Sequence, residues 1–189
     1  MKDKYIVLDV ETKKSFDEVG GRNFDQLGIS VLGIYRHGSD KYEAYEENQL
    51  SPLNQILSEA DLVIGFNIKG FDYVVLQPYL EIPLSKLPTL DILEDIKTTL
   101  GHRVSLNSVA KATLKKEKTG DGLEALRLYK SGEIEKIKKY CLNDVQITME
   151  IYEFGLKNHY ICYLSKDGLQ TLEMKVNWTP VHSEQGLLF

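Results

Sequence analysis

The stretch Tyr5-Ile6-Val7-Leu8-Asp9-Val10-Glu11 decides how the rest of the chain is understood. Its aliphatic run predicts a buried β-strand, because a short continuous apolar segment is typical of a strand inside a sheet. Side chains alternate between the two faces of a strand, so Asp9 and Glu11 point the same way. Neighbouring carboxylates repel each other unless a cation lies between them. Two interpretations follow: a site for a hard divalent ion, which prefers oxygen ligands, or a solvated strand end.

Working outward from this strand, the patterning predicts three strands, then alternating helices and strands, then a cluster of helices. The order predicts an α/β fold in which a mixed central sheet is flanked by helices, with a β-hairpin at the C-terminal end. The expected strands or extended segments are 29–35, 41–45, 62–66, 87–90, 160–164 and 169–176, and the expected helices are 51–58, 71–77, 91 onward, 105–114, a short helix to 130 and 133–157.

Composition restricts the class of protein. The chain has 189 residues, 42% hydrophobic and 27% charged, which is too apolar for a disordered chain and large enough for one domain. It has no apolar run of about 18 residues that would span a membrane. Cys141 and Cys162 lack ligand spacing, so neither a disulfide framework nor a zinc site is expected, and a cytoplasmic location is predicted. The net charge of −5 argues against nucleic-acid binding by bulk charge alone.

A second acidic position follows the predicted strand 62–66, in Gly65-Phe66-Asn67-Ile68-Lys69-Gly70-Phe71-Asp72. Asp72 is expected in the first turn of a helix. An acid there either caps the helix and suits its dipole or joins a metal site with Asp9 and Glu11. Asp91 is three residues before Glu94, so we expect a capping-box pair there and leave Asp91 out of the metal site.

The third acidic position lies on the long helix 133–157. Asp144 falls on or beside its apolar stripe, where an ionised carboxylate is costly unless it is paired. Tyr140 precedes it by one helical turn, so the two side chains are neighbours. The phenol either orients a water molecule or only tethers the helix through a Tyr–Asp hydrogen bond.

Taken in order, these motifs resemble those of the DEDDy 3′→5′ exonucleases, a branch of the ribonuclease H-like superfamily. The closest similarity is to the proofreading domains of family-B DNA polymerases, and it extends over about residues 3–156. It rests on three motifs, which are Asp9-Val10-Glu11, residues 65–72, and Tyr140 to Asp144. The sister branch has a histidine five residues before the last aspartate, where this chain has Lys139. No polymerase domain fits in 189 residues, so we expect a stand-alone exonuclease.

The resemblance implies a metal-dependent exonuclease that hydrolyses the 3′ end of DNA, single-stranded in preference, in replication or repair. It implies that two divalent ions, Mg²⁺ or Mn²⁺, are held by Asp9, Glu11, Asp72 and Asp144, with Asp9 bridging them and Tyr140 positioning the attacking water. Thr12, Asn67 and Phe71 are candidates for holding the terminal nucleotide, although Phe71 also suits a core position. Two lysine clusters, 111–118 and 136–139, either meet phosphates or form solvated helix faces.

The C-terminal tail carries a separate signal. Gln185-Gly186-Leu187-Leu188-Phe189 resembles the bacterial sliding-clamp-binding peptide, with Gln185, Leu188 and Phe189 at the matching positions and Gly186 where that motif usually has leucine. The alternatives are docking of the tail on its own domain or no role. Clamp binding would fit a bacterial cytosol or nucleoid and would compensate for the acidic charge by tethering.

The expected domain division is an exonuclease domain at 1–157, a hairpin extension at 158–178 and a flexible tail at 179–189. Three other functions stay open at this point. They are an inactive ribonuclease H-like module that recruits partners through the tail, an RNA-directed exonuclease, and an endonuclease such as a junction resolvase.

Overall fold

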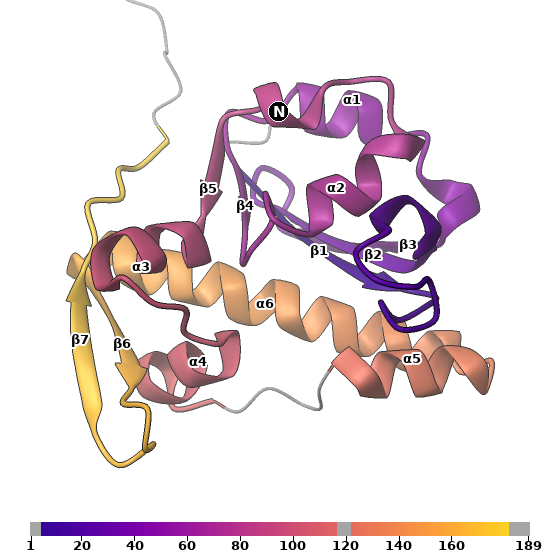
Figure 1. The fold of residues 1–189 in the computed structure, drawn as a ribbon. Helices are drawn as coiled ribbons and strands as arrows, with labels where there is room; N and C mark the ends of the chain where they lie inside the picture. Colours follow the sequence, from indigo (N-terminus) through magenta and orange to yellow (C-terminus); the bar gives the residue numbers. More distant parts are fainter. Residues whose placement is uncertain (1–4, 117–121, 182–189) are drawn as a thin grey trace, which may run out of the picture.

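The computed structural model describes residues 5–116 and 122–181 of the chain. A five-stranded sheet with the order β3-β2-β1-β4-β5 forms its centre (Figure 1). β2 is antiparallel to both β1 and β3, whereas β1, β4 and β5 run parallel. The first strand is therefore central, and its C-terminal end lies beside the C-terminal end of β4. This arrangement brings the polar segments after β1 and β4 to the same edge of the sheet.

The helices and strands described by the structure have the following bounds. They are β1 Ile6–Thr12, η1 Phe24–Gln26, β2 Ile29–Arg36, β3 Lys41–Tyr45, η2 Glu47–Gln49, α1 Leu53–Ser58, β4 Val63–Gly65, α2 Asp72–Leu76, η3 Gln77–Tyr79, η4 Leu84–Lys86, β5 Thr89–Asp91, α3 Ile92–Leu100, α4 Leu106–Leu114, α5 Gly122–Lys130, α6 Ile134–Asn158, β6 Tyr160–Leu164 and β7 Thr171–Lys175.

Helices cover the sheet on both faces, and the alternation of β1 decides which residue faces which layer. Ile6, Leu8 and Val10 pack into a core with α1 and α2. Val7 points the other way, into a core that includes α6. Figure 1 shows α6 lying along one face of the sheet and α1 and α2 on the other. Because Asp9 and Glu11 share the face of Val7, their side chains point toward the layer that contains α6.

The β6–β7 hairpin packs against α4 and the end of α6 (Figure 1). Thr113 Oγ1 donates to Cys162 O at 2.8 Å, and Cys162 N donates back to Thr113 Oγ1 at 2.9 Å. Trp178, just after the hairpin, stacks on Tyr152 of α6 and donates to Asp95 Oδ2 at 2.8 Å. The hairpin therefore shares a hydrophobic core with α6, and the predicted boundary between 157 and 158 stays a prediction.

The predicted fold class is confirmed, a mixed five-stranded sheet with flanking helices and a C-terminal hairpin. The differences are at element ends: β4 covers Val63–Gly65 instead of 62–66, and the extended piece at 87–90 is β5 at Thr89–Asp91. Cys141 and Cys162 are buried free thiols. No helix within 5–116 and 122–181 is long and apolar enough to cross a membrane.

Candidate metal centre

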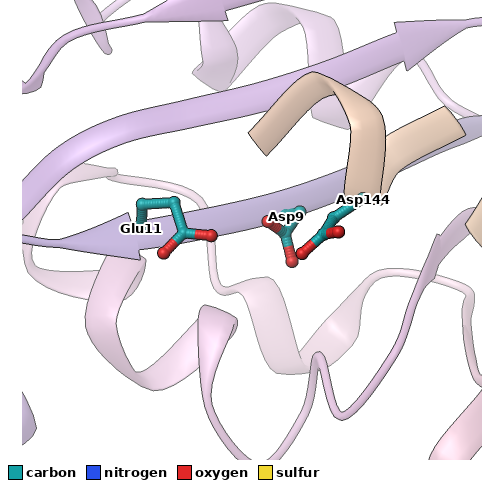
Figure 2. Close-up of side chains that lie close together, drawn as sticks. All are labelled: Asp9, Glu11 and Asp144. Carbon is teal, nitrogen blue, oxygen red and sulfur yellow. The ribbon is translucent and has the colours of Figure 1, made fainter. Parts of the chain in front are cut away.

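Three carboxylates from two distant segments meet at one place. Asp9 and Glu11 extend from β1 and Asp144 from α6, and each offers an oxygen within 4.8 Å of the others (Figure 2). Glu11 is 9% exposed and Asp144 2% exposed, so water screens their repulsion only in part. Such a set of oxygens is what a hard divalent cation requires. The donor set therefore fits Mg²⁺ or Mn²⁺, which would be held by these three residues.

A glycine on β2 allows α6 to approach this closely. Gly33 lies opposite Asp9 in the antiparallel ladder. A Cβ atom at Gly33 would lie 2.9 Å from Cys141 Sγ and 3.2 Å from Val145 Cγ2, both on α6. The thiol of Cys141 also lies 3.4 Å from Asp9 O. The missing side chain of Gly33 thus sets the distance between the helix that carries Asp144 and the strand that carries Asp9.

Asp72 is the fourth predicted acid and lies beside this cluster. It begins α2, is 4% exposed, and accepts a hydrogen bond from Val10 N at 2.9 Å. Burial raises the pKa of the Asp72 carboxyl well above its usual range, and the nearby Asp9 carboxylate raises that pKa further. A cation in the cluster would reverse this effect by favouring the ionised form. Asp72 lies outside the group of acids within 4.8 Å, so its part in a metal site stays a prediction.

Asp91 fixes the turn that precedes Asp72. Its carboxylate caps α3 by accepting from Leu93 N and Glu94 N, as predicted for a helix cap. It also accepts from Asn67 N at 2.9 Å and Lys69 N at 3.0 Å. Glu94 departs from the predicted capping-box role, because its carboxylate pairs with Lys69 Nζ at 2.7 Å.

The turn holds Asn67 in an unusual backbone conformation. Asn67 has a φ of 71°, in the left-handed region that asparagine tolerates better than most residues. Arg103 Nη2 donates to Asn67 Oδ1 at 3.2 Å. The side chain of Asn67 is therefore oriented by Arg103, which lies 36 residues further along the chain and was not predicted to contact it.

All eight residues predicted for catalysis or substrate binding line a single cavity of about 350 Å³. Its other walls include Phe16, Leu27 and, from α5, Leu123 and Leu126. The predicted residues that line it are Asp9, Glu11, Thr12, Asn67, Phe71, Asp72, Tyr140 and Asp144. The structure thus brings the whole predicted set together, while the role of each residue stays a prediction.

Three lysines of the two predicted clusters pair with glutamates. Lys136 pairs with Glu133, and Lys138 pairs with Glu46 and Glu135. Lys116 pairs with Glu150 at 2.6 Å. These pairs favour the interpretation of both clusters as solvated helix faces. The tail residues predicted to bind a clamp, Gln185, Leu188 and Phe189, lie outside the described residues.

A family model described as the RNase H superfamily matches residues 7–155, about four fifths of the chain and the whole region that builds the cavity. A search of curated proteins finds no match.

Proposed function

The chain belongs to the RNase H superfamily, and we propose that within it this protein is a metal-dependent 3′→5′ exonuclease acting on single-stranded DNA. Membership of the superfamily and the acidic cluster point to a metal-dependent nuclease. The observation that carries the finer proposal is the shared cavity. It combines four carboxylates with a tyrosine one helical turn before the last of them.

The size of the cavity supports action at a strand end. Its volume of about 350 Å³ is near the lower limit of ligand sites, about 300–1,000 Å³. A space of this size suits a single nucleotide. Asn67 and Thr12 offer polar groups on its wall, and Phe71 offers an aromatic ring. In this proposal these three residues hold the terminal nucleotide while the acids face its phosphate.

The chemistry divides between the metal ions and the chain. Two bound divalent ions would make a water nucleophilic and stabilise the leaving 3′-oxygen. Asp9, Glu11, Asp72 and Asp144 would hold them. Tyr140 is 6% exposed, and its phenol would accept or donate a hydrogen bond to orient the water. In this proposal the phenol orients the water and is not the base that deprotonates it.

The direct test follows a 5′-labelled single-stranded DNA oligonucleotide with Mg²⁺, Mn²⁺ or EDTA. We expect a ladder that shortens from the 3′ end, requires metal, and disappears in Asp9→Ala and Asp144→Ala. Glu81→Gln is the matched control, because Glu81 is an exposed acid that does not line the cavity. Absence of cleavage by folded wild-type protein under every metal would favour the alternative of an inactive recruitment module.

Two further substrates distinguish the remaining alternatives. Circular single-stranded DNA has no 3′ end, so its cleavage would indicate an endonuclease and contradict the proposal. An RNA oligonucleotide of the same sequence tests the sugar, because recognition of the 2′-OH distinguishes RNA from DNA. We expect DNA to be degraded faster. Preferential degradation of RNA would indicate the RNA-directed exonuclease.

The role of the tail is a separate part of the proposal. Binding of residues 185–189 to a bacterial sliding clamp would hold the enzyme near DNA ends without a basic surface. A pull-down with purified clamp, comparing the full chain with a variant that lacks these five residues, tests it. Equal capture of both proteins would remove the clamp from the proposal and leave the nuclease unaffected.

A further inference from the structure

A second cavity adjoins the acidic one. It has a volume of about 520 Å³ and shares Phe16, Asn67 and Phe71 with the acidic cavity. We call it the basic cleft and define it by its cationic and aromatic side chains, which are Arg22, Lys69, Lys97, Arg103, Phe16, Phe24 and Phe71. Only the Asn67 turn and two phenylalanine rings separate it from the metal centre.

Three of the four cations of the basic cleft make no salt bridge with a residue that the structure describes. Arg22 and Lys97 form no salt bridge with any residue in 5–116 or 122–181, and Arg103 is hydrogen-bonded only to Asn67 within those ranges. Lys69 is neutralised by Glu94. Lys116, Lys136 and Lys138, by contrast, pair with glutamates. Asp91 and Glu94 also line the cleft, but Asp91 accepts backbone N–H groups and Glu94 pairs with Lys69. A chain with a net charge of −5 thus places three cations that make no salt bridge with a described residue around one hollow.

The same cleft carries an aromatic wall. Phe16 and Phe24 contact edge to face with ring centroids 5.2 Å apart, and Phe71 lies 6.1 Å from both. All three rings are only partly buried. Positive side chains combined with accessible aromatic rings are typical of surfaces that bind single-stranded nucleic acid, where the rings stack with unpaired bases.

The position of the phosphates decides which part of a strand fits this cleft. The terminal nucleotide of a DNA strand with a free 3′-OH carries one phosphate, which is the scissile one. That phosphate must lie at the acids of the first cavity for hydrolysis to occur. Cations in a neighbouring cavity can therefore meet only phosphates further toward the 5′ end.

We propose that the basic cleft is a subsite for the strand upstream of the scissile bond. Arg22, Lys97 and Arg103 bind its phosphodiester groups, and the rings of Phe16 and Phe24 stack an unpaired base, while Phe71 remains at the terminal nucleotide. Asn67, oriented by Arg103, forms the wall shared with the metal centre. This proposal rests on the exonuclease function, and it predicts that affinity depends on strand length and requires single-stranded DNA next to the end.

The test compares substrates that reach the cleft with one that does not. The p-nitrophenyl ester of thymidine 5′-phosphate reports on the metal centre alone, and oligothymidylates from the dinucleotide to the decamer extend progressively into the cleft. For Arg22→Gln/Lys97→Gln we expect KM on the decamer to rise roughly 10- to 30-fold more than KM on the ester. The slope of log KM against log salt concentration should also fall by about 1.4, because each lost phosphate contact lowers this slope by about 0.7.

Two matched variants control for charge and folding. Lys157→Gln/Lys166→Gln removes the same charge from exposed positions that line neither cavity, and its KM should equal that of wild type. Arg22→Lys/Lys97→Arg keeps the charge and should restore the length dependence. Arg22 and Lys97 are preferable to Arg103 as test positions, because Arg103 also contacts Asn67.

The outcomes separate the two proposals. If wild type hydrolyses neither the ester nor the oligonucleotides, the exonuclease function fails. If wild type hydrolyses both, but Arg22→Gln/Lys97→Gln and Lys157→Gln/Lys166→Gln have the same KM on the decamer, the upstream subsite is overturned. An equal loss on the ester and the decamer would also overturn it, because the cations would then act on the terminal nucleotide.

Discussion

The acidic cavity and the basic cleft share a wall but are built by opposite means. The acids are buried or half-buried, and a backbone group fixes one of them, because Val10 N donates to the carboxylate of Asp72. The cations of the cleft extend from exposed positions, and two of them make no salt bridge within 5–116 and 122–181. The fold thus fixes the positions of the acids, whereas the exposed side chains of the cations can change conformation.

This difference predicts that the two regions affect the free energy of folding differently. Clustered, partly buried carboxylates oppose folding, because each raises the energy of ionising the next. Exposed cations cost little and interact weakly with their surroundings. Substitutions in the acidic cavity should therefore change activity and stability in opposite directions, whereas substitutions in the basic cleft should change binding alone.

The largest expected effect is that of Asp144→Asn. Cleavage should fall at least about 1,000-fold, equivalent to about 4 kcal/mol of transition-state stabilisation, because Asp144 would be a metal ligand. In EDTA the free energy of unfolding should rise by about 1 kcal/mol, since one member of a repelling set is removed. Denaturant titration with and without Mg²⁺ measures both effects, and wild type alone should gain stability from the metal.

Arg22→Gln, in the basic cleft, is the variant whose stability is compared with that of Asp144→Asn. It should leave the free energy of unfolding within about 0.5 kcal/mol of wild type, as is usual for an exposed position. A loss of stability in Asp144→Asn without metal would show that the carboxylates are not strained in the folded state and would remove the contrast between the two regions.

Next in size is the effect of Tyr140→Phe. If the phenol orients the attacking water, kcat should fall about 100-fold, the lower range for loss of a proton-handling group, with KM nearly unchanged. The ring remains to fill its buried place on α6, so stability should change little. Tyr160→Phe on the hairpin is the matched control. An unchanged kcat would instead support the tether interpretation, in which the phenol only anchors the helix.

Gly33→Ala tests the distance between the two segments that build the acidic cavity. The new Cβ would lie 2.9 Å from Cys141 Sγ, so α6 must shift. Overpacking of this kind costs about 1–3 kcal/mol, and displacement of Asp144 should lower kcat about tenfold or more. Thermal unfolding and steady-state kinetics measure the two losses.

The double variant Gly33→Ala/Cys141→Ala tests whether contact with Cys141 causes the loss of activity. Removing the sulfur relieves the closest of the contacts, so part of the lost activity should return relative to Gly33→Ala. Cys141→Ala alone is the control. Additive losses in the double variant would mean that the glycine matters for a reason other than the approach of α6.

Local patterns carried enough information to predict the acids. Asp9 and Glu11 stand out through strand alternation, and Asp144 stands out because it interrupts an apolar stripe. Such signals extend over a few residues, which is also why the elements were predicted to within a few residues of their observed bounds. The fold then placed these separate signals in one cavity.

The basic cleft was not predictable in this way. Arg22 comes from the segment before η1, Lys97 from α3, and Arg103 from the turn before α4, so no window of the sequence contains all three. The sequence instead indicated lysines that are close together along the chain, and the structure pairs three of them, Lys116, Lys136 and Lys138, with glutamates. Gly33 was missed for a similar reason, because a glycine within a strand does not reveal which helix packs on it.

The smallest expected effect is that of substituting Glu47, which holds the segment between β1 and β2 that lines the basic cleft. Glu47 accepts from Lys13 Nζ at 2.6 Å, from Tyr79 Oη at 2.7 Å and from Ile29 N at 3.1 Å. These contacts hold both ends of the segment between β1 and β2, which carries Phe16, Arg22 and Phe24. Burial alone would raise the pKa of Glu47, but the hydrogen bonds from Lys13, Tyr79 and Ile29 lower the pKa below its usual value.

The direction of this pKa shift sets the pH dependence expected for Glu47→Gln. A lowered pKa in the folded state stabilises the protein above the unfolded pKa of about 4.3, and the contribution is lost as the pH falls through the folded value. At pH 7 the variant should be less stable than wild type by about 1 kcal/mol, a modest value for a partly exposed charged pair. The difference should shrink as the pH falls below about 4.3. A constant difference from neutral to acidic pH would mean that the amide loses packing, not charge, and that the outer wall of the cleft does not depend on this ion pair.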